Sequence, residues 1–193
     1  MPAPRILVFA GSIRIGSMNA QLANLAAEEF KSAGAEDTAI SLKDYAMPIY
    51  DGDLEARSGP PDAAIVLKKM FQAHQGIFIA SPEYNASVTP LLKNTLDWVS
   101  RVRDPGEAPL AAYRDRAFAI GGASNGGYGA MRSLIALRQV LEIGCGALVI
   151  PDQIAVSRAG EAFDDNTRFR DEGNARRLKG VVQSLIRFAG HYS

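Results

Sequence analysis

Residues 11–19, with the sequence GSIRIGSMN, combine groups that could bind an anion. They offer two hydroxyls, one guanidinium and one amide, from Ser12, Ser17, Arg14 and Asn19. The stretch follows the apolar run RILVFA and precedes a helical pattern, so its backbone N–H groups would lie at a helix N-terminus. A phosphate monoester suits such a loop, because Arg14 can add charge-assisted hydrogen bonds.

A plain capped turn is the alternative interpretation of these residues. Ser17 or Asn19 would then cap the helix, and Arg14 would be solvated. The GxxxxGK(S/T) pattern of nucleoside-triphosphate loops is absent, and Gly11 and Gly16 do not have the GxGxxG spacing. Phosphate binding and simple capping therefore both stay open for this stretch taken alone.

Two later segments could contribute to the same site. SPEYN (81–85) offers a carboxylate, an aromatic ring and an amide, and GGASNGGYG (121–129) has glycines that let a flat ligand approach the main chain. Glu83 could act as an acid or base, could orient its loop, or could be solvated. Tyr84 and Tyr128 could equally be ordinary packing residues. If each segment follows a strand of one parallel sheet, all three loops emerge at the edge where such sheets bind ligands.

Five short apolar runs indicate the strands that would position these loops. Most are continuously apolar, which is typical of strands covered on both faces. The runs are 5–11, 37–42, 76–81, 116–122 and 147–151. Apolar residues at helical spacing lie in 22–30, 63–70, 92–99, 134–141 and 178–186. Thr89 can cap the third of these helices, and Pro90 suits its first turn.

This alternation predicts one α/β domain over residues 1–193, with a doubly wound parallel sheet, helices on both faces and right-handed crossovers. Two stretches rich in Pro, Gly and charge, 45–61 and 102–114, are predicted to be surface loops. Residues 152–170 have no pattern that decides their structure.

Composition narrows the classes of partner. Lys plus Arg equals Asp plus Glu, at 21 each, which gives no electrostatic footprint for nucleic acid or an anionic membrane. The only cysteine, Cys145, precedes an apolar run and is expected to be a buried, inert thiol rather than a reactive one. The two histidines lack ligand spacing, so no metal site is expected. No signal peptide or membrane span is apparent, so a cytoplasmic location is expected.

The three segments together resemble the NADPH-dependent FMN reductase family, which includes quinone, azo-dye and chromate reductases. The resemblance rests on GSIRIGSMN, SPEYNASVTPLLKNTLDW and GGASNGGYGAMRSLIALRQVL, and it covers nearly the whole chain. It implies a flavodoxin-like fold with five parallel strands in the order 2-1-3-4-5. It also implies FMN as the cofactor, with NADPH or NADH as the co-substrate; no ribose-phosphate motif favours either nicotinamide.

The resemblance also implies residue roles. The FMN phosphate would be held by Ser12, Arg14, Ser17 and Asn19. The edge and face of the flavin ring would be followed, largely through main-chain groups, by Pro82, Glu83, Tyr84 and Asn85. The other side of the ring would be lined by Ser124, Asn125, Gly126 and Gly127. Asn125 departs from the residue that the family often has there.

The implied reaction passes two electrons from a nicotinamide through flavin to a quinone, azo or chromate acceptor. The flavin carries the chemistry, so no protein acid or base is assigned as catalytic. A non-enzymatic FMN electron carrier and a flavin-based redox sensor are the alternatives. The resemblance further implies a homodimer or homotetramer formed through the 134–141 helix, with 47–55 similar to a segment that approaches the partner's flavin.

Overall fold

The computed structural model describes residues 3–192 and contains one parallel sheet of five strands. The strands lie in the order β2-β1-β3-β4-β5. Their bounds are β1 Arg5–Ala10, β2 Glu36–Ser41, β3 Gly76–Ala80, β4 Ala117–Ala123 and β5 Leu148–Val156. The parallel sheet expected from the apolar runs and the strand order implied by the resemblance are both confirmed. The arrangement is flavodoxin-like.

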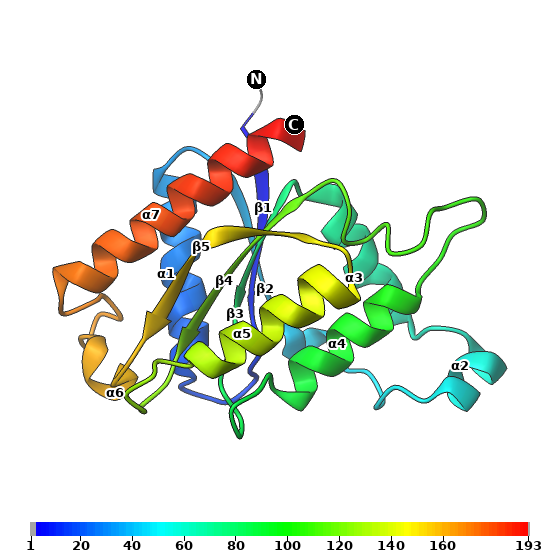
Figure 1. The fold of residues 1–193 in the computed structure, drawn as a ribbon, viewed down its shortest axis with the longest axis horizontal. Coiled ribbons are helices and arrows are strands. Elements are labelled where there is room, and N and C mark those ends of the chain that lie inside the picture. The colour runs from blue at the N-terminus through cyan, green and yellow to red at the C-terminus, as the bar shows by residue number, and fades with distance from the viewer. Residues whose placement is uncertain (1–2, 193) are drawn as a thin grey trace.

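Helices cover both faces of this sheet (Figure 1). Helices α1 (Met18–Ser32) and α7 (Glu172–Ala189) pack on one face, and α3 (Asp62–Ala73), α4 (Pro90–Arg101) and α5 (Met131–Gln139) pack on the other. Two short helices, α2 (Gly52–Ser58) and α6 (Ala159–Ala162), lie outside these layers. Both ends of the described chain lie at the edge opposite the carboxyl ends of the strands.

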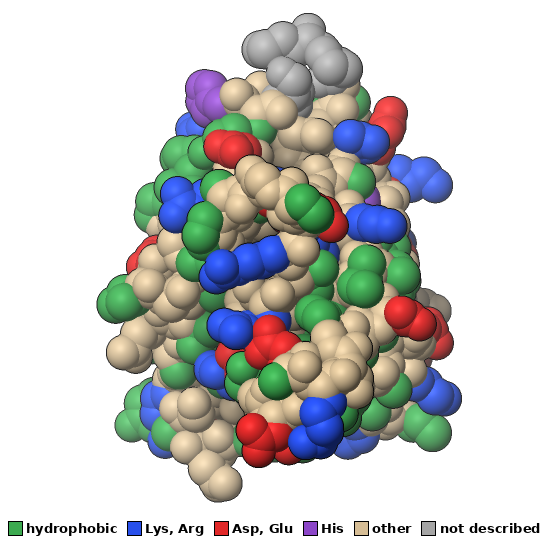
Figure 2. Space-filling view, turned by 90° about the vertical axis from the view of Figure 1, so that its right-hand side faces the viewer, with side chains coloured by type: hydrophobic (Ala, Val, Ile, Leu, Met, Phe, Trp, Pro, Cys, Tyr) green, Lys and Arg blue, Asp and Glu red, His purple; other side chains and the backbone are tan. Residues whose placement is uncertain are grey.

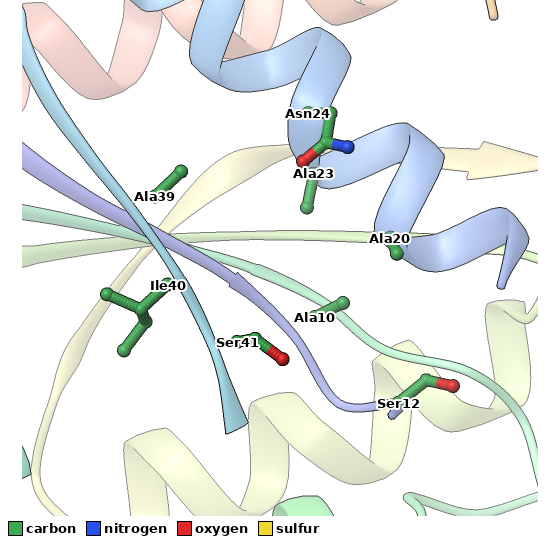
Figure 3. A pocket seen from close by; sticks show the side chains of 8 residues that line it. All are labelled: Ala10, Ser12, Ala20, Ala23, Asn24, Ala39, Ile40 and Ser41. Atoms are coloured by element: carbon green, nitrogen blue, oxygen red, sulfur yellow. The ribbon is translucent and has the colours of Figure 1, made fainter. Parts of the chain in front are cut away.

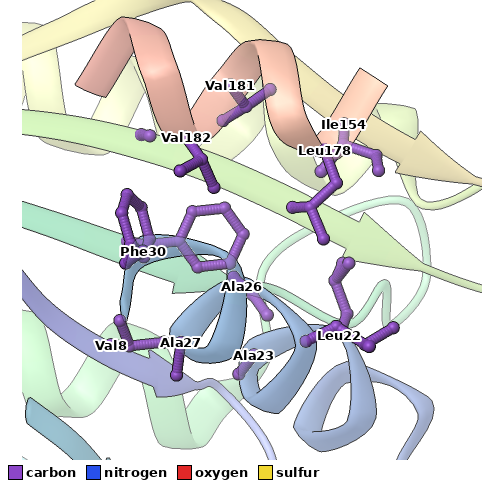
Figure 4. Close-up of a cluster of buried hydrophobic side chains, with 14 of the residues drawn as sticks. Val8, Leu22, Ala23, Ala26, Ala27, Phe30, Ile154, Leu178, Val181 and Val182 are labelled. Carbon is purple, nitrogen blue, oxygen red and sulfur yellow. The ribbon is translucent and has the colours of Figure 1, made fainter. Parts of the chain in front are cut away.

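The α1–α7 face shows how the apolar periodicity becomes a packed core (Figure 4). Leu22, Ala26 and Phe30 from α1 meet Leu178 and Val182 from α7 over the sheet, and all five are at most 2% exposed. Removing such side chains from water stabilises the fold by about 1.5–3 kcal/mol each for the larger ones. This packing fixes where α1 begins, and therefore where the loop before it lies.

The third predicted helix begins as its sequence indicates. Thr89 is the N-cap of α4 and accepts a hydrogen bond from the Leu92 N–H at 3.2 Å, with Pro90 in the first turn. The Thr89 hydroxyl also donates to the Gly11 carbonyl at 2.8 Å. One buried side chain thus joins the start of α4 to the end of β1.

Several boundaries differ from the sequence-based prediction. Residues 45–61 were predicted to be irregular, but 52–58 form α2, which begins where Asp51 caps the N–H groups of Asp53 and Leu54. Strand β5 continues to Val156, past the predicted end at Pro151, and its register with β4 shifts in a bulge between Phe118 and Ile120. The 134–141 helix begins earlier, at Met131, and ends in a π-turn over Val140–Gly144.

Residues 102–114 contain no helix or strand, as predicted. They are held by Lys68 of α3, whose side chain is buried and pairs with Asp104 and Glu107. Figure 2 shows the face on this side of the molecule, where Lys and Arg side chains are interspersed with Asp and Glu. This distribution agrees with the balanced composition.

Cys145 is buried as expected, and burial raises the pKa of its thiol to about 11. A thiol with this pKa is almost fully protonated near neutral pH, so it is a poor nucleophile. Within residues 3–192, no helix is long and apolar enough to cross a membrane.

Candidate functional site

The three segments meet at the carboxyl edge of the sheet, as expected from their positions after neighbouring strands. Loop 11–17 follows β1, loop 81–89 follows β3 and loop 124–130 follows β4, and β3 lies between the other two strands. Together they enclose a hollow of about 150 Å³. It is lined by Ser12, Arg14, Ser17, Met18, Asn19, Pro82, Glu83, Tyr84, Ala123 and Ser124. A hollow of about 380 Å³ shares Ser12, Arg14 and Tyr84 with it.

The loop between β1 and α1 keeps unused hydrogen-bond donors. Ser17 is the N-cap of α1 and accepts from the Ala20 N–H at 3.3 Å, which matches the capping interpretation. The Arg14 guanidinium is exposed and donates only to the Gly16 carbonyl, at 3.2 Å. Within the described chain, the backbone N–H groups of Ser12, Ile13, Ile15 and Gly16 donate to no protein acceptor. The loop therefore combines a cation, free N–H groups and a helix N-terminus, which is what an anion needs.

Asn19 has a different position from the other three predicted phosphate ligands. Its side chain is 4% exposed, donates to the Ala123 carbonyl at 2.9 Å and accepts from the Ala123 N–H at 2.9 Å. The amide thus ties the first turn of α1 to the end of β4. A direct contact of Asn19 with phosphate stays a prediction, and its visible contribution is to fix the distance between two walls of the hollow.

The PEYN segment forms a tight turn. Tyr84 and Ser87 exchange two backbone hydrogen bonds of 3.0 Å, and the central residues Asn85 and Ala86 have φ of 49° and 64°. Two left-handed central residues define a type I′ turn, which Asn tolerates and Ala does not favour. Tyr84 stands at the base of this turn with 54% of its surface exposed. More than half of this residue is therefore accessible to a ligand.

Glu83 is bonded to the first turn of α5. Its carboxylate accepts from the N–H groups of Arg132 and Ser133 at 3.1 and 3.3 Å, and from Arg132 Nε at 2.8 Å. Burial alone would raise the pKa of Glu83, but the hydrogen bonds from Arg132 and Ser133 outweigh it and lower that pKa. Glu83 is therefore a carboxylate at neutral pH and orients its loop, one of the roles that its sequence context left open.

Strand β4 and the loop after it contain two kinds of glycine. A Cβ at Gly122 would lie 2.8 Å from the Ala130 Cβ, so close packing excludes a side chain there. A Cβ at Gly127 would meet nothing within 4 Å, and one at Gly126 only the Ser124 hydroxyl at 3.7 Å. Neither Gly126 nor Gly127 has a positive φ, so the protein's own fold does not require glycine there. Both leave open backbone that a flat ligand could approach.

Asn125 lies in the same loop and holds α6. Its side-chain oxygen accepts from the Gly160 N–H at 2.8 Å, while the Ser124 hydroxyl accepts from the Gly126 N–H at 3.2 Å. Whether Asn125 also touches a ligand stays a prediction.

A separate hollow of about 290 Å³ lies on the other side of Ser12, between α1 and β2 (Figure 3). Its lining is small or neutral: Ala10, Ser12, Ala20, Ala23, Asn24, Ala39, Ile40 and Ser41. Figure 3 shows Asn24 and Ala23 on α1 above this part of the sheet. Because none of these side chains carries a charge, a phosphate monoester fits the Arg14 side of Ser12 better.

Sequence reasoning missed two contributors at this edge. Arg132 lies within the quoted segment GGYGAMR but received no role, because its partner Glu83 is 49 residues away. Ser133 donates its hydroxyl hydrogen bond to the Pro82 carbonyl at 2.7 Å, and no local pattern marks that contact. Both residues join loop 81–89 to α5.

The residues present fit FMN. Loop 12–17 suits its phosphate, and the open backbone at Gly126 and Gly127, with the exposed Tyr84 ring, suits a flat heterocycle.

Comparison with known proteins also indicates an FMN-dependent protein. Residues 4–161 match the model of the NADPH-dependent FMN reductase family. An NAD(P)H-dependent FMN reductase from Pseudomonas aeruginosa is 31% identical over 94% of this chain and 92% of its own. A probable NADPH:quinone oxidoreductase from Oryza sativa is 33% identical over 97% of this chain and 89% of its own.

Solved structures agree on the fold. The flavoenzyme FerB, an NAD(P)H:acceptor oxidoreductase from Paracoccus denitrificans, superposes with a TM-score of 0.80. The alignment covers 98% of this chain and 99% of FerB at 24% identity. The flavodoxin-like fold, the residues at its carboxyl edge and the family match agree: the chain belongs to the NADPH-dependent FMN reductase family and is an oxidoreductase that uses FMN and NAD(P)H.

Proposed function

We propose that this enzyme transfers two electrons from NADPH or NADH to a quinone-type small-molecule acceptor through FMN held at the carboxyl edge of the sheet. The observation that carries the proposal is that the Arg14 loop shares a hollow with Ser124, at the start of the loop that leaves open backbone at Gly126 and Gly127. Relatives named as quinone oxidoreductases or quinone reductases support the acceptor class. Azo compounds and chromate are further acceptors within the same proposal.

The residues divide into binding and positioning roles. Ser12, Arg14 and the free N–H groups of the loop bind the phosphate, and Ser17 orders the start of α1. Asn19 keeps this loop at a fixed distance from β4. Pro82, Tyr84, Asn85 and the 124–127 backbone border the ring. FMN, when bound, supplies hydride acceptance and two-electron donation, and the protein supplies orientation and electrostatics.

The substrates would meet the ring beside Tyr84. This residue borders both the phosphate-side hollow and the larger hollow of about 380 Å³ that reaches Thr89, Pro90 and Leu91. An exposed aromatic ring at such a boundary can stack on a nicotinamide or on a quinone in turn. The protein needs no acid or base side chain for this exchange, and Glu83 is fully engaged with α5.

The proposal includes a homodimer, or a homotetramer built from it, in the cytoplasm. Ile135, Ile143 and Leu148 are 63%, 81% and 42% exposed along α5, its π-turn and the edge strand β5. Apolar side chains gathered on adjacent elements favour a protein–protein contact. Ile49, in the 47–55 segment, is 73% exposed and would be available to a partner copy.

The test is a visible spectrum of the purified protein followed by anaerobic titration with NADPH and NADH, and then turnover with a quinone. We expect a bound flavin spectrum, bleaching by a nicotinamide, and steady-state quinone reduction without any added reductase. Bleaching with no quinone turnover would favour an electron carrier or sensor instead. Light scattering at micromolar concentration tests the assembly, and a strictly monomeric mass would overturn that part.

A further inference from the structure

Helix α5 lacks an N-cap of its own. The residue at its N-cap position, Ala130, is left-handed with φ of 67° and has no side-chain acceptor. The first N–H groups of a helix need acceptors from outside the helix. Glu83, from the loop after β3, supplies one through Oε2, which accepts from the N–H groups of Arg132 and Ser133.

The second carboxylate oxygen of Glu83 is also hydrogen-bonded. Oε1 accepts from Arg132 Nε at 2.8 Å and pairs with Arg132 Nη2. The Glu83 side chain is 6% exposed, whereas the Arg132 side chain is 54% exposed. The ion pair is therefore anchored on its buried carboxylate, with the guanidinium on the solvent side.

A second connection runs in parallel with this ion pair. The Ser133 hydroxyl donates to the Pro82 carbonyl at 2.7 Å and lies 2.9 Å from the Ser81 hydroxyl. The segment Ser81–Glu83 and the first turn of α5 are thus joined by both charged and neutral hydrogen bonds. Loss of the ion pair alone leaves the neutral connection intact.

The ion pair is connected to two exposed aromatic residues. Tyr84 directly follows Glu83, and the Arg132 guanidinium carbon lies 5.3 Å from the centroid of the Tyr128 ring. Tyr84 and Tyr128 are 54% and 71% exposed. A cation above the face of an aromatic ring is attracted to that ring. Arg132 therefore restrains Tyr128 through a cation–π contact as well as Glu83 through the ion pair.

We propose that Glu83 and Arg132 form a clamp that positions the ring-binding loops 81–87 and 124–130 relative to each other. Glu83 acts as a positioning residue through Arg132 and the α5 N-terminus, and FMN affinity and electron transfer to the acceptor both depend on the spacing it sets. This inference rests on the proposed FMN site.

The test compares Glu83→Gln and Arg132→Met, singly and together, with Glu142→Gln as the control. Glu142, in the π-turn that follows α5, pairs with Arg138 at the opposite end of the helix, so its substitution removes a carboxylate away from the site. We expect each clamp variant to weaken FMN binding by about tenfold, in line with the loss of charge-assisted hydrogen bonds. The double variant is expected to bind FMN no more weakly than the single variant with the lower affinity, because each single substitution already breaks the same ion pair.

A merely structural role would lower the melting temperature but leave the FMN-saturated enzyme unchanged. The clamp instead predicts a shifted visible circular dichroism spectrum of bound flavin and a reduced kcat for quinone at saturating FMN. Compared with Arg132→Met, Arg132→Lys should restore part of the wild-type flavin spectrum and part of the kcat. If Glu83→Gln does not fold, Arg132→Met breaks the same pair from its exposed side.

The outcomes separate this inference from the function on which it rests. Unchanged affinity, spectrum and kcat in folded Arg132→Met or Glu83→Gln would overturn the clamp while leaving the FMN site in place. Effects of the two single variants that add fully would also overturn it. A wild-type chain that does not bind FMN would overturn the proposed function, and the clamp with it.

Discussion

Loop 12–17 and loop 81–87 lie at the same edge of the sheet but are held in opposite ways. Every hydrogen bond of residues 12–16 stays within that loop and the start of α1. Loop 81–87, by contrast, is closed by a type I′ turn and joined to α5 through Pro82 and Glu83. Loop 12–17 is thus held only by its own residues and the start of α1, whereas loop 81–87 is anchored to a neighbouring helix.

This difference suggests different roles for the two loops in ligand binding. A loop with free N–H groups and an exposed cation gains hydrogen bonds when an anion binds. Part of the order of that loop is therefore established only on binding. A loop that is closed by its own turn and bonded to a helix is organised before binding and presents a fixed surface. We therefore expect changes in loop 12–17 to act on FMN affinity. Changes in loop 81–87, apart from those that break its Glu83 anchor, should act mainly on electron transfer at the flavin ring.

The largest expected effect is that of Arg14→Ala on FMN binding. The guanidinium contacts only the Gly16 carbonyl, so its loss should leave folding unchanged while removing the only cation of loop 12–17. Charge-assisted hydrogen bonds contribute about 1.5–3 kcal/mol, which predicts roughly tenfold or greater loss of affinity. Titration of the apoprotein with FMN measures it, with Arg5→Ala at the opposite end of β1 as the control. Equal affinities in wild type and Arg14→Ala would contradict the assignment.

Gly127→Ala should weaken FMN binding several-fold without destabilising the apoprotein. The new Cβ meets no protein atom within 4 Å, so any loss reports on a ligand that approaches the backbone there. Gly180→Ala, in α7, also places its Cβ in open space and serves as the matched control for a glycine replacement. If both variants bind FMN like the wild type, the 124–127 loop does not border the ring.

Tyr84 offers a test of loop 81–87 at the ring. Tyr84→Phe should keep FMN and most of the activity, because stacking needs only the ring. Tyr84→Ala should keep FMN but slow quinone reduction by several-fold relative to the Phe variant. Stopped-flow measurement of both half-reactions decides this. Wild-type quinone rates in both variants would place the substrate elsewhere, and loss of FMN from Tyr84→Ala would indicate a packing role.

The stabilising contribution of Glu83 to the folded protein should depend on pH only under acidic conditions. The pKa of Glu83 is lowered in the folded protein, so its stabilising contribution is complete above the ordinary value of about 4.3 and is lost as the pH falls through the lowered pKa. Thermal unfolding from pH 3 to 7 should show this acid loss in the wild type and less of it in Glu83→Gln. The same acid slope in both proteins would show that Glu83 does not cause it.

The smallest expected effect concerns the turn itself. Ala86 has φ of 64°, a left-handed conformation that costs an L-residue roughly 1–2 kcal/mol and costs glycine little. After the greater entropy of unfolded glycine is subtracted, Ala86→Gly should raise the free energy of unfolding by about 0.5–1 kcal/mol. Chemical denaturation measures it. A destabilised Ala86→Gly would mean that this turn is not strained.

The sequence predicted the elements better than the contacts between distant loops. The apolar runs located all five strands, and Thr89–Pro90 located the start of α4. The helix at 52–58 was missed because its capping residue, Asp51, lies in a stretch rich in turn-forming residues. Residues 12–17 could be put forward as an anion loop because the groups that suggest it are close together in the sequence.

The positioning contacts could not be predicted in the same way. Asn19 bonds to Ala123, 104 residues away, and Glu83 bonds to Arg132, 49 residues away. Such pairs depend on the crossovers that bring β1, β3 and β4 together, and a single sequence has no periodicity that reports them. The phosphate contact of Asn19 stays a prediction, and the bonds of its side chain between α1 and β4 had no signal in the sequence.

Amide hydrogen exchange with and without FMN tests the contrast between the two loops most directly. We predict that FMN slows exchange at residues 12–17 by tenfold or more, while the amides of Tyr84 and Ser87 exchange slowly even in the apoprotein and change little. Riboflavin, which lacks the phosphate, should give no protection at 12–17. Protection of residues 12–17 by riboflavin equal to that by FMN, or FMN-dependent ordering confined to 81–87, would contradict the account.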